Sequence, residues 1–461
     1  MAGASGYLCR MTPTLAALRF GTGLSPDIAP PADVGEMRAR LAGPDEMARD
    51  LPLPGWSGRM VEFSAYQQVI RDTRDLADRE ARADLRKAAR EGLDRAYLRD
   101  LAVTVVRGAM TRDGLRERLV WFWTGHFAVQ EGQGLLRRTV GGHVEDAIRP
   151  YVARSFADLL KAAVTHPAML RYLDQDGSTG PNSVRARRGG GLNENLAREV
   201  LELHTLGVGG AYGQGDVRQL AELFTGMSVG KDGAYEFRRN MAEPGAETVL
   251  GRAYGDETPN RHDITQVLGD LAVHPDTARH VSGKLARHFV ADTPPEALVA
   301  AMSATWIESG GDLMAVYGAM LDHPEAWGPQ LRKVRRPLDL IVATVRATGG
   351  AERLLRMAPR DVRRGLQQPL ERMGQPFLRP EGPDGWPEEA EAWITPQALA
   401  ARLDWAMEAA SRLDPAPDPR AFVEMALAEQ AGPRTLFAAE AAEDRRAGVG
   451  LVLASPEFQR R

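Results

Sequence analysis

Hydrophobic residues recur every three or four positions along most of the chain, which is the spacing of helices that bury one face. The segments with the clearest repeat are 85–110, 113–123, 144–164, 194–206, 216–223, 276–290, 295–308, 312–322, 337–348 and 396–413. Alanine, leucine, arginine and glutamate dominate these segments, and all four are strong helix formers. The pattern predicts a mainly α protein.

One short region departs from the helical pattern. Residues 227–229 and 234–238 lie on either side of the pair at 232–233, Asp-Gly, which favours a tight turn between antiparallel strands. Residues 248–250 have the composition of a further strand. The sequence therefore predicts one small β-hairpin near residues 227–250.

Two stretches rich in proline and glycine, residues 27–54 and 376–393, interrupt the helical pattern. Trp56, Trp386 and Trp393 lie within or beside them. Because indole side chains favour burial, we expect these stretches to be connections that wrap the surface.

The chain has 461 residues, of which 43% are hydrophobic and 26% charged, an ordinary composition for a chain with a sizeable core. Disorder, collagen and a bundle of membrane helices are excluded as descriptions of the whole. Lys and Arg number 58 against 62 Asp and Glu, which argues against a dedicated nucleic-acid binder but leaves room for a local anion site. We predict one large multi-helix domain over residues 1–461, in which residues 330–461 form a peripheral C-terminal helical subregion.

Residues 1–23 lack the basic start and the unbroken apolar run of a secretory signal. No stretch of about 18 apolar residues occurs, so we expect no membrane span. Cys9 is the single cysteine, which excludes an internal disulfide and a cysteine-based metal site. We expect a cytoplasmic protein in which Cys9 is reduced.

Three of the nine histidines, at positions 166, 274 and 323, directly precede a proline. Proline suits the first position of a helix, and the residue before it is extended and can cap. We therefore expect His166, His274 and His323 to start helices, so His166 is assigned a structural role.

Residues 193–207 carry the signals of a complete helix. Asn193 is a natural N-cap and Gly207 suits the left-handed position after the helix. At 100° per residue, Asn195, Arg198, Glu199 and Glu202 share one face. His204 projects from the opposite, apolar face and is expected to be a structural imidazole within the core.

Glu199 and Glu202 allow two interpretations. Spaced three apart, they are candidate catalytic carboxylates or ligands of a divalent metal, with His126 as a third ligand. Alternatively, they form a solvated face or pair with Arg198. Trp121, Phe122 and Trp123 surround His126 in sequence and form either core packing or a substrate wall.

Arg185, Arg187 and Arg188 precede three glycines and a helix start, which predicts an anion cradle for phosphate, sulfate or carboxylate. The alternative is a mobile surface loop. The candidate ligand-binding residues are Arg185, Arg187, Arg188, Asn193, Asn195 and Asp174.

Several runs resemble the domain of unknown function 1800 family. They are RFG at 19–21, HPAMLRYLD at 166–174, GPNS at 180–183, GLNENLAREVLELHTLGV at 191–208, FTGM at 224–227, KLARHFVAD at 284–292 and ASPEF at 454–458. The resemblance implies a mostly helical bacterial protein whose activity is not established. Many members are exported, and a sulfatase-like protein is the implied partner.

The chain departs from that family at two places. Thr124 and Gly125 stand where the family usually has His-Asn before the counterpart of His126. At 242–247 the chain has AEPGAE, where many members have His-Asp-Pro-Gly-x-Lys, so a His is lost at Ala242 and a Lys at Glu247. The family positions that carry over are His126, His166, Asp174, Asn193, Glu194, Asn195, Arg198, Glu199, Glu202 and His204.

Three functions follow. The first is a metal-assisted hydrolase, in which Glu199 or Glu202 is ligand or general base, His126 is ligand or acid, and Arg198 stabilises charge. The second is a non-catalytic scaffold whose polar residues form a buried hydrogen-bond network. The third is a binder of anionic small molecules at residues 185–191.

Overall fold

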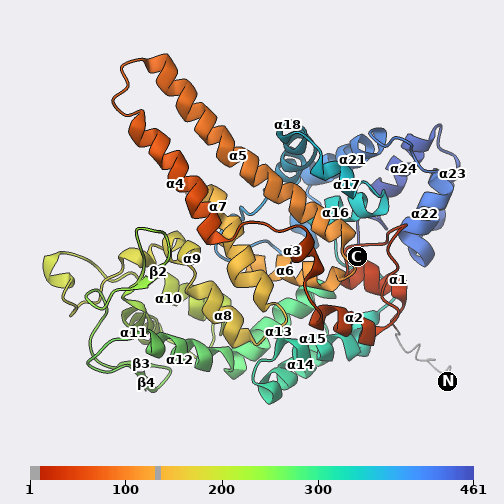
Figure 1. The fold of residues 1–461 in the computed structure, drawn as a ribbon. Helices are drawn as coiled ribbons and strands as arrows, with labels where there is room; N and C mark the ends of the chain where they lie inside the picture. Colours follow the sequence, from red (N-terminus) through yellow and green to blue (C-terminus); the bar gives the residue numbers. More distant parts are fainter. Residues whose placement is uncertain (1–10, 130–135) are drawn as a thin grey trace, which may run out of the picture.

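The computed structural model describes residues 11–129 and 136–461, and Figure 1 shows a mainly α fold, as predicted. The predictions about Cys9 and the chain start lie outside the described residues. The α-helices are α1 Pro13–Leu15, α2 Val34–Ala42, α3 Glu46–Asp50, α4 Trp56–Asp72, α5 Arg79–Met110, α6 Gly114–His126, α7 Leu136–His143, α8 Phe156–Val164, α9 Pro167–Tyr172, α10 Asn195–Glu199, α11 Gln214–Phe224, α12 Arg261–Ala272, α13 Pro275–Phe289, α14 Glu296–Ser309, α15 Leu313–Asp322, α16 Pro337–Ala347, α17 Ala351–Leu355, α18 Pro359–Val362, α19 Gln368–Arg372, α20 Ala390–Trp393, α21 Pro396–Ser411, α22 Pro419–Leu427, α23 Pro433–Glu440 and α24 Arg445–Ala454. Turns of π-helix lie at η1 Ala16–Phe20, η2 Val144–Ile148, η6 Val200–His204 and η8 Arg363–Gln367.

The predicted hairpin is present, and a second one follows it. Strands β1 Met227–Val229 and β2 Tyr235–Phe237 pair antiparallel, with Ser228 opposite Glu236. Strands β3 Glu247–Val249 and β4 Arg252–Tyr254 form a separate two-stranded sheet.

The stretch 27–54, predicted to be a connection that wraps the surface, contains helices α2 and α3, which its composition did not indicate. Asp33 accepts a hydrogen bond from the backbone N–H of Glu36, and Asp45 accepts one from Ala48. These side chains satisfy backbone groups that a helix start leaves free, so short helices form despite the flanking prolines and glycines.

Helices α4 and α5 form an antiparallel arm that projects from the body of the protein (Figure 1). At its base, Arg59 on α4 and Asp100 on α5 form a buried ion pair of 2.6 Å. The C-terminal half of α5 continues into the body, where Leu101 and Val105 are fully buried.

The hydrophobic core consists of two large clusters. One is built mainly from α6 to α15, and the other from the C-terminal half of α5, α16 and helices α19 to α24. Trp121 on α6 and Leu378 pack against both clusters. The division into a main domain and a C-terminal subregion stays a prediction.

Candidate functional site

The predicted polar helix is not one regular rod. It starts as α10, but from Val200 to His204 it continues as the π-helical turn η6. The spacing of 100° per residue therefore holds only as far as Glu199. Gly207 has the predicted left-handed backbone, with φ of 88°.

The acidic face of this segment carries ion pairs. Arg198 lies 3.3 Å from both Glu194 and Glu202, each one helical turn away. Burial, together with the charges of Glu202 and Asp384, raises the pKa of Glu199. The structure thus brings Arg198 and Glu202 together and leaves Glu199 half-buried beside them.

His126 and His204 meet in the core. His126 donates its Nε2–H to the carbonyl oxygen of His204 at 3.1 Å, and the two rings are 5.7 Å apart between centroids. Burial and the nearby ammonium of Lys284 lower the pKa of His126 well below its usual value and that of His204 to about 3. Both imidazoles are therefore neutral near pH 7.

The metal hypothesis finds no support in this geometry. Within residues 11–129 and 136–461, no three His, Cys, Asp or Glu side chains are grouped so that they could hold a metal ion. His126, Glu199 and Glu202 therefore do not form a recognisable set of ligands.

The predicted anion cradle is an exposed turn. Arg185, Arg187 and Arg188 lie on the surface in or next to a short 3₁₀ turn. The helix that follows them, α10, has only five residues, which limits the dipole it can offer an anion. Anion binding at this turn stays a prediction.

The other predicted ligand-binding residues have structural contacts. Asn193 donates its side-chain amide to the carbonyl oxygens of Leu173 and Asp174, at 2.9 and 3.2 Å. Its Oδ1 accepts the backbone N–H of Asn195 at 2.9 Å, but the N-cap of α10 is Glu194 and not Asn193 as predicted. His166 caps α9 through Nδ1, as its His-Pro pair predicts, and His274 and His323 cap α13 and the 3₁₀ helix at Pro324–Trp327.

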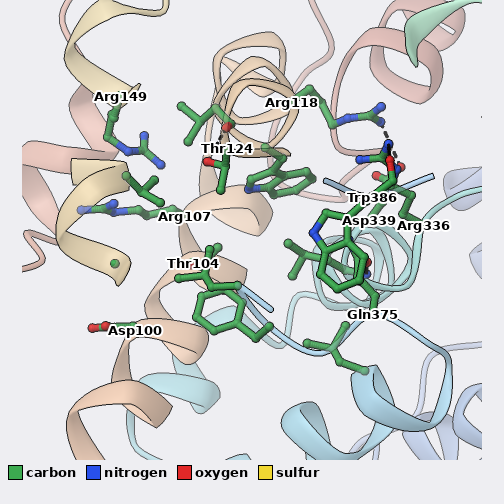
Figure 2. A pocket seen from close by; sticks show the side chains of 18 of the residues that line it. Asp100, Thr104, Arg107, Arg118, Thr124, Arg149, Arg336, Asp339, Gln375 and Trp386 are labelled. Atoms are coloured by element: carbon green, nitrogen blue, oxygen red, sulfur yellow. Dashed lines mark hydrogen bonds and ion pairs between the residues drawn. The ribbon is translucent and has the colours of Figure 1, made fainter. Parts of the chain in front are cut away.

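A cavity that no sequence motif indicated lies where the two core clusters meet. Figure 2 shows it between helices α5, α6 and α7, helix α16 and the segment 375–386. The volume open to the centres of water-sized molecules is about 70 Å³, which is room for several waters or a small organic group. We call it the Trp121 cavity. Its apolar lining consists of Leu53, Val120, Trp121, Val144, Leu338, Leu370, Pro376, Phe377, Leu378 and Trp386.

Helix α6 separates this cavity from the histidine pair. Trp121 and Thr124 line the cavity, whereas Phe122, Trp123 and His126 are buried on the other side of the helix. Of the three aromatic residues predicted to form either core packing or a substrate wall, only Trp121 therefore lines the cavity, and Phe122 and Trp123 belong to the core. Thr124, where the resemblance leads one to expect a histidine, donates its hydroxyl to the Val120 carbonyl at 2.7 Å.

The segment 375–386 forms the opposite wall and is held closely to α6. A Cβ on Gly385 would lie 2.0 Å from the carbonyl oxygen of Gly125, so only glycine fits there. Gln375 accepts the N–H of Leu338 at 2.8 Å, and Tyr97 donates its hydroxyl to the Phe377 carbonyl at 2.6 Å. These bonds fix a wall that the sequence predicted only as a connection wrapping the surface.

Charged side chains gather at two ends of the Trp121 cavity (Figure 2). At one end, Arg107 contacts Glu145 at 2.7 Å, while Arg149 contacts Glu117 at 2.8 Å and Asp45 at 3.0 Å. We call these five residues the Glu117 cluster. Asp100 lies nearby, and burial raises its pKa to about 6 although Arg59 opposes the shift.

The other end is the Asp339 cluster, which consists of Arg118, His288, Asp292, Lys333, Arg335, Arg336, Asp339, Glu388 and Arg461. Arg118 contacts Asp339 at 3.0 Å and donates to Nε2 of His288 at 3.0 Å. Nδ1 of His288 then donates to Glu388 at 2.8 Å. Burial raises the pKa of Glu388, but Arg336 and His288 outweigh it and hold that pKa well below its usual range.

Sequence reasoning missed the cavity because its walls come from distant segments. Arg118, Asp339 and Arg461 have no spacing that links them, and buried arginines resemble exposed ones in a sequence. The one available signal was Trp386, an indole in an otherwise polar, glycine-rich stretch.

These features define a mainly α protein with an internal cavity whose ends are charged. The family described as "Protein of unknown function (DUF1800)" matches residues 18–460, and the chain belongs to this family. No curated protein and no solved structure is detectably similar to the chain. None of the helices in the described parts of the chain is long and apolar enough to cross a membrane.

Proposed function

We propose that this protein binds a small organic molecule in the Trp121 cavity. The observation that carries the proposal is the composition of the lining: aromatic and aliphatic side chains surround the space, and a few charged groups lie at its ends. Ligand sites in proteins commonly have this composition, because apolar walls supply affinity and a few polar groups fix orientation.

The walls support a preformed site. Trp386 comes from a segment that Gly385 holds against Gly125, and Trp121 comes from the middle of a regular helix. Side chains mounted on such fixed backbone lose little freedom when a ligand binds, which favours affinity.

The test is a substitution that fills the cavity. Thr104 on α5 lines the space, and Thr104→Phe would occupy it, whereas Ala88→Phe adds the same ring on the exposed part of α5. We expect 2-phenylethanol or phenylacetate to bind wild type and Ala88→Phe, and Thr104→Phe to lose at least ten-fold in affinity, by saturation-transfer NMR or calorimetry. Binding that is insensitive to Thr104→Phe, or no binding of either compound to wild type, would contradict the proposal.

A second candidate is acid–base catalysis at Glu199, the hydrolase hypothesis without its metal. The raised pKa of Glu199 supports it, as does Tyr172, whose pKa rises to about 12 through burial and the charges of Glu199 and Asp384. Turnover of p-nitrophenyl acetate that Glu199→Gln abolishes and Glu202→Gln retains would favour it. Equal loss in the two variants, or no turnover by the wild type, would count against it.

The sulfatase-like partner, the absence of nucleic-acid binding and the cytoplasmic location remain predictions of the sequence. For the anionic small molecule predicted to bind the exposed arginine turn, the Trp121 cavity is an alternative and more enclosed binding site.

A further inference from the structure

The Asp339 cluster holds more cations than carboxylates. Among its side chains, five are cationic, namely Arg118, Lys333, Arg335, Arg336 and Arg461, and three are carboxylates, namely Asp292, Asp339 and Glu388. His288 adds no charge near neutral pH, because burial lowers its pKa well below the usual value. The side chains of this cluster therefore carry an excess of two positive charges.

The opposite end of the cavity has no such excess. In the Glu117 cluster, the two cations Arg107 and Arg149 face three carboxylates. Asp100 and Arg59 balance each other in a separate pair. A negatively charged ligand group is therefore expected at the Asp339 cluster and not at the Glu117 cluster.

Hydrogen-bond donors near the Asp339 cluster are left over as well. Nη1 of Arg461 and Nε of Arg336 are buried and find no hydrogen-bond partner among the described residues. Arg461 and Arg336 are 1% and 7% exposed, so bulk solvent does not reach them freely. Two acceptors there are also unpaired, but each lies near a cation. Oδ1 of Asp339 is 3.5 Å from Arg335, and Oε2 of Glu388 is 3.8 Å from Lys333.

Burying cations without counter-charges costs free energy, and the pKa values of two arginines in the cluster are lowered accordingly. Burial and the repulsion of Arg118 lower the pKa of Arg461 to about 9, and burial with the neighbouring arginines lowers the pKa of Arg118 to about 10. An anion placed between Arg336 and Arg461 would supply both the missing charge and the missing acceptors.

We infer that the ligand of the Trp121 cavity is an organic acid: a carboxylate bound at Arg336 and Arg461, attached to an aromatic or aliphatic body lying against Phe377 and Trp386. This inference rests on the proposed function, because it names the class of molecule that the same cavity takes.

The test compares two molecules of nearly equal size, phenylacetate and 2-phenylethanol, on the full chain. We expect the acid to bind at least ten-fold more tightly than the alcohol, and added salt to weaken the acid alone. Equal affinities would overturn the organic-acid inference while leaving the cavity as a binding site. Failure of both compounds to bind would remove the proposed function along with it.

Arg336→Gln and Arg461→Gln locate the carboxylate. Each variant should remove most of the preference for the acid, and circular dichroism checks that each variant is folded. Arg198→Gln, which removes a guanidinium from the α10 surface, is the control and should keep the full preference. A preference that survives both Arg336→Gln and Arg461→Gln would overturn the assignment of the carboxylate.

Discussion

His126 on α6 donates a hydrogen bond to the backbone carbonyl of His204, at the point where the predicted polar helix has become a π-helical turn. A second imidazole, that of His280, bonds the preceding carbonyl at Leu203, at 3.3 Å. The last carbonyls of a helix have no partner within the helix. Two histidines from other helices therefore satisfy the end of η6.

Removing the His126 donor should destabilise the protein. His126→Phe keeps an aromatic ring of similar size but leaves the buried His204 carbonyl unsatisfied, so we expect a loss of about 1–3 kcal/mol in the free energy of unfolding. Urea denaturation followed by circular dichroism measures it. His262→Phe, on an exposed side chain, is the control and should change stability by less than about 0.5 kcal/mol.

Acid should weaken the fold through the same histidines. The pKa of His204 falls to about 3 in the folded protein because of burial, against about 6.5 in an unfolded chain. Between these values the unfolded state binds the proton and the folded state does not, so stability falls as the pH drops from about 6.5 towards 3. His204→Gln should flatten that slope; an unchanged slope would show that His204 does not cause it.

Glu247 should give the opposite dependence on pH. Burial and the carboxyl group of Glu222 raise its pKa to about 7, so the folded state holds a proton that the unfolded state releases near pH 4.5. Its contribution to stability is present below about pH 4.5 and is lost as the pH rises through 7. Glu247→Gln should therefore stabilise the protein at pH 8, by about 1 kcal/mol, and change it little at pH 5.

Glu247→Lys would restore the residue type that the family resemblance leads one to expect and should stabilise at pH 8 at least as much, because the ammonium can pair with Glu222. Glu257→Gln, an exposed substitution nearby, is the control. Equal effects of Glu247→Gln at pH 5 and pH 8 would refute the proton-sharing pair.

The wall of the Trp121 cavity should depend on Gly385. Gly385 and Gly374 both have left-handed backbone, with φ of 84° and 90°, but only a Cβ on Gly385 meets another atom, the Gly125 carbonyl. Gly374→Ala should cost about 1 kcal/mol from backbone strain alone. Gly385→Ala should cost distinctly more and displace Trp386, which thermal denaturation and phenylacetate titration would detect.

The sequence predicted the elements whose causes are local. The repeat of apolar positions gave α13 to within one residue at each end, and the Asp232-Gly233 pair placed the first hairpin. It failed at η6 because a π turn depends on partners from other helices, here His126 and His280. It did not indicate α2, because the proline- and glycine-rich composition of residues 27–54 concealed the capping role of Asp33.

The candidate site was harder to foresee than the fold. The sequence suggested that Glu199, Glu202 and His126 form one site. The structure places the two carboxylates beside Arg198, whereas the imidazole of His126 bonds the His204 carbonyl. The Trp121 cavity depends on contacts such as Arg118 with Asp339, which are 221 positions apart. No periodicity or spacing encodes such a pair.

Helix α6 is a shared wall. Thr124 lines the Trp121 cavity. His126, two positions further along the same helix, donates a hydrogen bond to the His204 carbonyl at the end of η6. A ligand that displaces Thr124 should therefore displace His126 as well, because both residues lie on α6. We therefore expect occupancy of the Trp121 cavity to be coupled, through α6, to the position of the segment that carries Glu199 and Glu202.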